Sequence, residues 1–149
     1  MVEMRRVLKP LGHVAVRDAD YSSMLAFPAL RGIDEWRRIY RAVATLNGAQ
    51  PDAGRYLGHW LAGAGFSRGS VVPSLSVVPH LDAEATRGWG KAWEQRALES
   101  DFARQAVEYG VATWAELEAI SRCWGEWGEA EGAVLYYVNG EALAQKQPS

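Results

Sequence analysis

Two acidic residues near the start of the chain have side chains suited to holding a polar ligand. Asp18 and Asp20 follow the apolar run at 13–16, and Arg17 and Tyr21 flank them. Such a run, ending in charges, is typical of a buried parallel strand whose carboxyl end opens to solvent. Ligands of open α/β sheets bind at the carboxyl ends of the strands. We therefore expect Asp18, Asp20 and Tyr21 to contact a small-molecule substrate, with loop capping and an ion pair to Arg17 as the alternative.

A second candidate pair combines an arginine with a histidine. Arg55 and His59 are four residues apart in an apolar-periodic segment, so on one helix they would share a face. A neutral imidazole can take a proton from a hydroxyl group of a substrate, whereas the alternative is a helix-surface pair without chemistry. His13 and His80 have no partner at ligand spacing, and Cys123 is the single cysteine, so no metal site is predicted.

Aromatic residues recur at helical spacing in this tryptophan-rich chain, which has seven tryptophans in 149 residues. Stripes of this kind most often form a core, but the same residue types also line apolar ligand pockets. We expect Trp36 and Tyr40 to contact an apolar or aromatic substrate. The stripes are Trp36 with Tyr40, Trp89 with Trp93, and Trp124 with Trp127.

Composition and charge exclude several classes of function. The net charge is −2 and the isoelectric point is near 5.9, so the basic face of a nucleic-acid-binding protein is absent. No apolar run approaches the roughly 18 residues of a membrane span. A single cysteine excludes an internal disulfide framework and fits a reducing, cytoplasmic setting.

Hydrophobic periodicity and turn residues predict alternating strands and helices. Thr113 and Glu116 form the sequence pattern of a capping box, and Gly65 is expected to end a helix in the left-handed conformation. Pro73 indicates an edge strand or a bulge. The predicted order is a helix end at about 1–8, a strand at 13–18, a loop or short helix at 22–32, helices at 33–47 and 52–64, a strand at 68–79, a helix at 82–98, a short helix that is capped by Ser100-Asp101 and stops at Gly110, a helix behind Thr113, a strand at 133–138 and a frayed tail at 146–149.

Three segments resemble class I S-adenosylmethionine-dependent methyltransferases, specifically the ubiquinone/menaquinone-biosynthesis-like, type 11 branch. They are MRRVLKPLG at 4–12, PDAGRYLGHWLAGAGF at 51–66, and the region 96–127. The resemblance implies an α/β fold: the C-terminal part of a Rossmann-like sheet, comprising strands five to seven, with the last strand antiparallel between the other two. Residues 1–149 would form a single partial methyltransferase domain with helical lid insertions at about 22–47 and 82–130.

The resemblance also implies the cofactor S-adenosylmethionine and methyl transfer to a small, apolar or aromatic acceptor. The family's glycine-rich cofactor loop lies upstream of these segments. Gly63 and Gly65 follow a predicted helix, while Gly88 and Gly90 lie inside another, so neither pair has the strand-to-helix context of such a loop. We therefore assign no cofactor-binding and no catalytic residue, and expect this chain alone to be inactive.

Two other functions fit the same residues. A sheet without the family's first four strands exposes apolar surface, so self-association or pairing through the strand edge at 13–18 is expected. The chain would then be a non-catalytic partner or regulatory chain that docks on another methyltransferase subunit. The other alternative is an unrelated α+β domain that binds small ligands in a tryptophan pocket.

Overall fold

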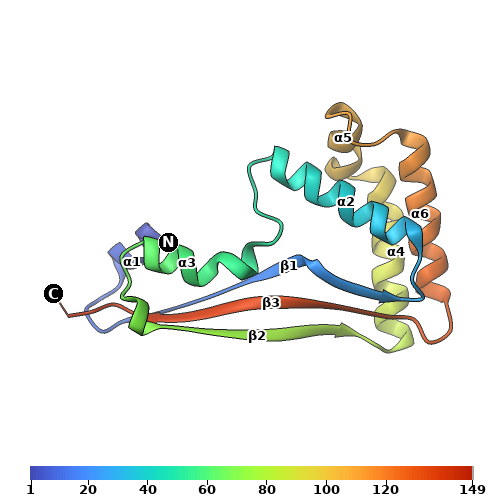
Figure 1. Cartoon of the computed structure of the whole chain (residues 1–149). Coiled ribbons are helices and arrows are strands. Elements are labelled where there is room, and N and C mark those ends of the chain that lie inside the picture. Colours follow the sequence, from blue (N-terminus) through green and yellow to red (C-terminus); the bar gives the residue numbers. More distant parts are fainter. Residues whose placement is uncertain (149) are drawn as a thin grey trace. The chain divides into compact units, whose positions relative to one another are not determined.

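The structure is a computed structural model and describes residues 1–148. Groups of helices separate the three strands along the chain (Figure 1). The elements are α1 (Val2–Val7), β1 (His13–Phe27), α2 (Arg31–Leu46), the 3-10 turn η1 (Ala53–Tyr56), α3 (Leu57–Gly63), the 3-10 turn η2 (Arg68–Ser70), β2 (Val71–His80), α4 (Ala83–Glu99), α5 (Asp101–Glu108), α6 (Trp114–Glu129) and β3 (Val134–Gln145).

The three strands form one sheet in the order β1-β3-β2 (Figure 1). Lys146, directly after β3, pairs with the start of β1: its N–H donates to Gly12 at 2.9 Å and its carbonyl accepts from Leu11 at 3.0 Å. The end of β3 therefore lies beside the start of β1, which makes these neighbours antiparallel. The predicted insertion of the last strand between the other two is confirmed, as is the edge position of the strand that carries Pro73.

The chain divides into two compact units, and all three strands contribute residues to both. The first unit comprises residues 1–20, 52–78 and the chain from residue 137 on. The second unit comprises residues 21–51 and 79–136. Each unit has its own core.

The core of the first unit lies between α3 and β3. Leu57, Leu61 and Phe66 pack there against Ala142 and Ala144, and all five are buried. The two alanines leave room for the larger side chains of the helix. As predicted, Gly65 ends the helix with a positive φ of 91°, and the N–H of Phe66 returns to the carbonyl of Leu61 at 3.2 Å.

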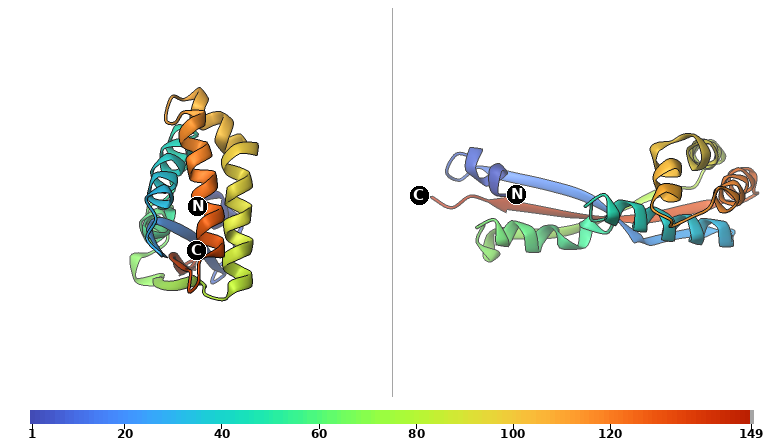
Figure 2. Two further views of the ribbon diagram at one scale, coloured as in Figure 1. Left: turned by 90° about the vertical axis from the view of Figure 1, so that its right-hand side faces the viewer. Right: turned by 90° about the horizontal axis from the view of Figure 1, so that it is seen from above.

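The core of the second unit is a helical layer with a tryptophan centre. Helices α4 and α6 lie side by side (Figure 2). A β-carbon added at Gly90 of α4 would lie 2.7 Å from both the Cα of Gly128 and the carbonyl oxygen of Trp124, so the helices approach at backbone contact. The predicted capping box of α6 is confirmed, because Thr113 and Glu116 bond to each other's backbone N–H. The helix at 82–98 is also confirmed as α4, with the carboxylate of Asp82 accepting from the N–H of Ala85.

Two predicted strand ends were wrong. The segment 22–27, predicted as loop or short helix, continues β1 to Phe27, and β3 extends to Gln145 instead of ending at residue 138. In β1 the extension is held by its neighbours: Met24 is buried, and its carbonyl accepts from Arg37 at 2.6 Å. In β3 the pair Asn139-Gly140, which has turn composition, stays extended within the strand.

Two predicted helix details also need correction. The helix expected at 52–64 is a 3-10 turn, η1, followed by the shorter α3. Ser100 occupies the N-cap position of α5 without capping it, because its hydroxyl donates instead to the carbonyl of Arg96 at 2.6 Å.

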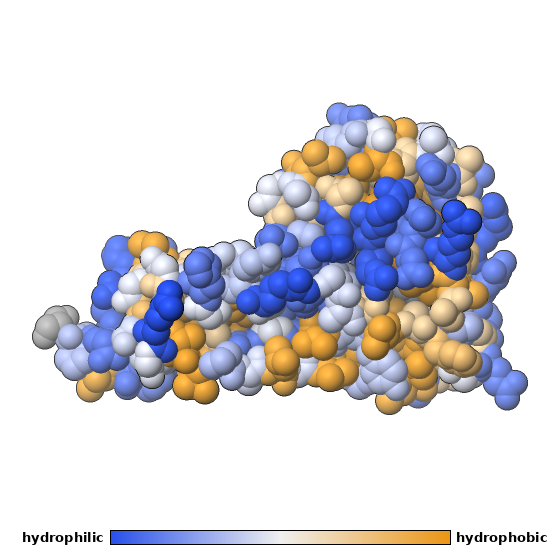
Figure 3. Space-filling view, viewed as in Figure 1, coloured by the Kyte–Doolittle hydropathy of each residue, from blue (hydrophilic) through white to orange (hydrophobic). Residues whose placement is uncertain are grey.

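Apolar side chains are exposed along the edge strand β2. Val72, Leu75 and Val77 are each more than half exposed, and apolar surface follows this strand in Figure 3. Among the described residues, no helix has the length and apolar character needed to cross a membrane.

Candidate functional site

Asp20 and Arg55 form a bidentate ion pair within the first unit. The Nε and Nη2 atoms of Arg55 donate to the two carboxylate oxygens of Asp20 at 2.6 and 2.8 Å. The Asp20 side chain is only 10% exposed, whereas that of Arg55 is 50% exposed. The hydrogen bonds to Asp20 raise the pKa of the Arg55 guanidinium. The pair therefore fixes a charged donor at the surface while it compensates a buried carboxylate.

Three elements of the first unit bring this pair together. Asp20 lies on β1, Arg55 lies on η1, and η1 crosses β1 and β3 at backbone distance. Two of the seven candidate site residues are thus joined, although they are 35 positions apart in the sequence.

Asp18 is not part of this pair. Its side chain is exposed, and its Oδ1 accepts from the adjacent N–H of Ala19 at 2.8 Å, which is a local capping contact. Arg17 does not form the expected alternative pair with Asp18; it lies 3.4 Å from the carboxylate of Glu141 on β3.

Glu141 is the centre of a polar cluster that sequence reasoning missed. The hydroxyls of Ser76 and Ser74 donate to its two oxygens at 2.7 and 2.9 Å. These hydrogen bonds lower the pKa of the Glu141 carboxyl, and Arg17 adds to the effect. The alternation of Ser74 and Ser76 on a strand was the available signal, since residues two apart point to one face.

The second group of candidate residues is an aromatic cluster in the second unit. The rings of Tyr21 and Tyr40 lie 4.6 Å apart, and the Tyr40 hydroxyl donates to that of Tyr21 at 3.4 Å. Trp36 stacks on Tyr40 at 5.2 Å and meets Trp93 edge-on at 4.5 Å. Trp36 is 0% exposed, so it supports the two half-buried tyrosines from beneath. Phe102, 6.1 Å from Tyr40, is a member that the sequence analysis did not name.

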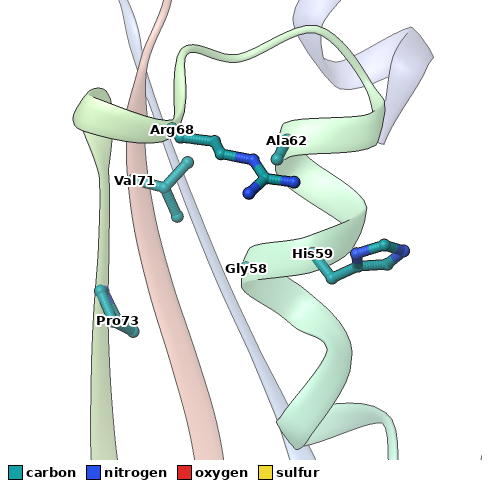
Figure 4. Close-up of a pocket in the computed structure, with 6 residues that line it drawn as sticks. All are labelled: Gly58, His59, Ala62, Arg68, Val71 and Pro73. Carbon is teal, nitrogen blue, oxygen red and sulfur yellow. The ribbon is translucent and has the colours of Figure 1, made fainter.

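His59 has surroundings different from those of Arg55. The boundary between η1 and α3 separates the two residues, so the regular helix spacing assumed from the sequence does not apply. His59 lies at a pocket of about 320 Å³ between α3 and β2. Figure 4 shows Arg68 extending across this pocket toward α3, while the imidazole of His59 points away from Arg68. The other lining residues are Gly58, Ala62, Val71 and Pro73.

The two glycine pairs considered from the sequence do not form the cofactor loop that the resemblance implies. Gly63 lies inside α3, and Gly88 and Gly90 lie inside α4, so none of them follows a strand at the start of a helix. Within residues 1–148, no three histidine, cysteine, aspartate or glutamate side chains are grouped as metal ligands would be.

One curated protein matches this chain over almost its whole length. The chain is 24% identical over 147 residues to an uncharacterized methyltransferase of Schizosaccharomyces pombe. The chain is distantly related to a methyltransferase. The match covers 99% of this chain and 52% of the yeast protein, so the chain spans about half the length of the curated relative. No family model matches the sequence.

Proposed function

We propose that this chain is the acceptor-binding, C-terminal part of an S-adenosylmethionine-dependent methyltransferase. The observation that carries the proposal is the alignment of 99% of the chain with about half of a methyltransferase. The order β1-β3-β2, with β3 antiparallel to β1, adds support because strands five to seven of class I methyltransferases have this arrangement. A sheet of three strands with bare edges also fits part of a larger sheet.

The two residue groups, each taken within its own unit, suit different kinds of acceptor group. Arg55, held by Asp20, presents a guanidinium of fixed orientation that can bind a polar group. Tyr21 and Tyr40 present ring surface and two hydroxyls, which suits an aromatic acceptor with a polar substituent. The cofactor supplies the methyl group when it is bound. The residues of this chain contribute by orienting the acceptor, which is the main requirement of an in-line displacement.

Binding measurements on the purified chain test the proposal. All tryptophans except Trp60 lie in the second unit, so their fluorescence reports on ligands at the aromatic cluster. Small aromatic probes such as phenol and benzoate should quench this fluorescence saturably. Tyr40→Ala should weaken binding by up to about tenfold, because one aromatic contact contributes about 0.5–1.5 kcal/mol. Trp114→Phe, at an exposed position outside the cluster, is the control and should bind as the parent does.

Calorimetric titration with S-adenosylmethionine and S-adenosylhomocysteine gives the complementary result. The chain alone should bind neither, because neither of its two candidate glycine pairs forms a cofactor loop. Micromolar binding of either compound, or methyl transfer by the chain alone, would show that the division of roles proposed here is incorrect.

The second candidate function is docking on another methyltransferase subunit. The observation that favours it is the edge position of β1, whose hydrogen-bonded neighbour in the described sheet is β3, with residues 13–18 as the predicted docking edge. A strand of a partner can add to such an edge through backbone hydrogen bonds. Sedimentation of the purified chain with a candidate methyltransferase subunit tests this function: a stable stoichiometric complex supports docking, and independent sedimentation opposes it.

A further inference from the structure

Two glycines in the first unit meet where η1 crosses the sheet. Gly54 of η1 and Gly140 of β3 are both buried. A β-carbon on Gly54 would lie 2.7 Å from the carbonyl oxygen of Asp18 and 2.7 Å from the N of Gly140. A β-carbon on Gly140 would overlap the carbonyl group of Gly54 and lie 2.7 Å from its Cα. All these contacts are with backbone atoms, so no side chain can move aside to make room.

The close approach of Gly54 to Gly140 and to the Asp18 carbonyl sets the distance between Arg55 and β1. Arg55 directly follows Gly54, and Asp20 is two residues beyond the Asp18 carbonyl that Gly54 touches. The backbone contact and the ion pair thus join the same two short segments, 54–55 and 18–20. A bidentate arginine–carboxylate pair needs two parallel N–H···O bonds at once, so it tolerates little displacement of either backbone.

We propose that Gly140 is a positioning residue for Arg55, acting through the backbone of Gly54. Its missing side chain lets η1 lie against β3, and this contact keeps the guanidinium within bidentate reach of Asp20. An alanine at position 140 would lift η1 from the sheet and break the pair without changing any charged residue. This inference rests on the proposed function only for the role of Arg55 in acceptor binding; the positioning itself is a property of the first unit.

Nuclear magnetic resonance of the arginine side chains tests the positioning directly. Asp20→Asn defines the Nε–H signal of an Arg55 that has lost its carboxylate partner. Gly140→Ala should move the Arg55 Nε–H signal to that reference position and speed its exchange with solvent at least about tenfold, because a hydrogen bond between charged groups is lost. Gly63→Ala is the matched control: it lies in the same unit, a β-carbon there meets nothing within 4 Å, and the signal should stay at the parent position.

The remaining outcomes also decide the question. A Gly140→Ala protein that folds and keeps the parent Arg55 signal would overturn the proposal. If the variant unfolds in buffer, the spectra are repeated in sucrose, which favours the folded state. Failure to fold there as well would mean that Gly140 is required for the fold and is not specific to Arg55. Neither cofactor nor acceptor enters the measurement, so its failure is distinguishable from failure of the proposed function.

Discussion

The two units fix their candidate residues by opposite means. In the first unit small residues let backbones touch, and this proximity places a charged pair. In the second unit large rings fill space, and their volumes set the distances between Tyr21, Trp36 and Tyr40. Protein interiors are close-packed, so the first arrangement is sensitive to added atoms and the second to removed ones. The difference tells which kind of substitution damages each unit.

The contrast is not complete, because the second unit also contains a backbone crossing. Gly90 and Gly128 bring α4 and α6 together beside the buried ring of Trp124. The second unit is therefore sensitive to both kinds of change, and the predictions below separate them.

Removal of the buried ring of Trp124 should have the largest effect on the free energy of unfolding. Trp124 is fully buried and packs against Trp36 and Trp127 at 5.1 and 5.5 Å. Trp124→Ala should lower the free energy of unfolding by about 3–5 kcal/mol, from lost burial and the cavity left behind. Urea unfolding followed by circular dichroism measures this loss. Trp114→Ala, at a site that is 48% exposed, should change it by less than about 0.5 kcal/mol. Equal effects of the two substitutions would contradict the assignment of Trp124 to the core.

Addition of one methyl group should have opposite effects on stability at Gly88 and Gly90, two glycines of α4. Gly90→Ala should destabilise the protein by about 1–3 kcal/mol, because the new β-carbon overlaps α6. Gly88→Ala, where nothing lies within 4 Å, should stabilise α4 by about 0.5–1 kcal/mol, because alanine favours a helix interior. Thermal and urea unfolding of both variants check the opposite signs. Stabilisation by both substitutions would mean that helix propensity, and not the close approach of α4 to α6, decides the outcome.

Loss of a cap should have a smaller effect. Thr113→Ala removes the hydroxyl that accepts from the backbone N–H of Glu116. This loss should lower the free energy of unfolding by about 1 kcal/mol. Ser100→Ala is the matched control, because this serine stands at an N-cap without bonding to the N–H groups of α5. Its substitution should cost clearly less in the same urea experiment. A larger loss for Ser100 than for Thr113 would argue against the capping box.

The smallest expected effect is the contribution of His80 to the pH dependence of stability. His80 stacks on Trp89 at 4.5 Å, and burial lowers its pKa below the ordinary value of 6.5, with Asp82 opposing this shift. The unfolded chain therefore binds more protons at this site than the folded one as the pH falls through about 6.5. Stability should decline from pH 7 toward pH 5.5, and the decline should be shallower in His80→Phe, which keeps a ring without the charge. Urea midpoints at the two pH values measure the difference between the variants.

Local signals in the sequence predicted local structure well. The capping box at Thr113 and the left-handed end of α3 at Gly65 each depend on a few neighbouring residues, and both are confirmed. The strand order was predicted through the family resemblance, because no pattern within the three strands determines which one lies in the middle.

What the sequence missed depends on contacts between distant segments. Asn139-Gly140 has the composition of a turn, yet it stays extended in β3, with Gly140 lying against Gly54. Arg55 had a predicted neighbour in His59, but its partner is Asp20, 35 positions away. The expected contacts with substrate stay predictions for all seven candidate residues, whereas the structure establishes which of them touch one another. The seven are Asp18, Asp20, Tyr21, Trp36, Tyr40, Arg55 and His59.

The edge strand β2 combines a risk of aggregation with a defence against it. Val72, Leu75 and Val77 expose the apolar, β-branched-rich surface that favours stacking of strands from separate molecules. Pro73 and Pro79 are six positions apart, so their missing N–H groups fall on the same side of the strand. Proline has no N–H to donate to a neighbouring strand, so a strand that paired with β2 at these two positions would find no donor there. The growth of fibrils from this edge is thus opposed by the backbone, even where the side chains would promote it.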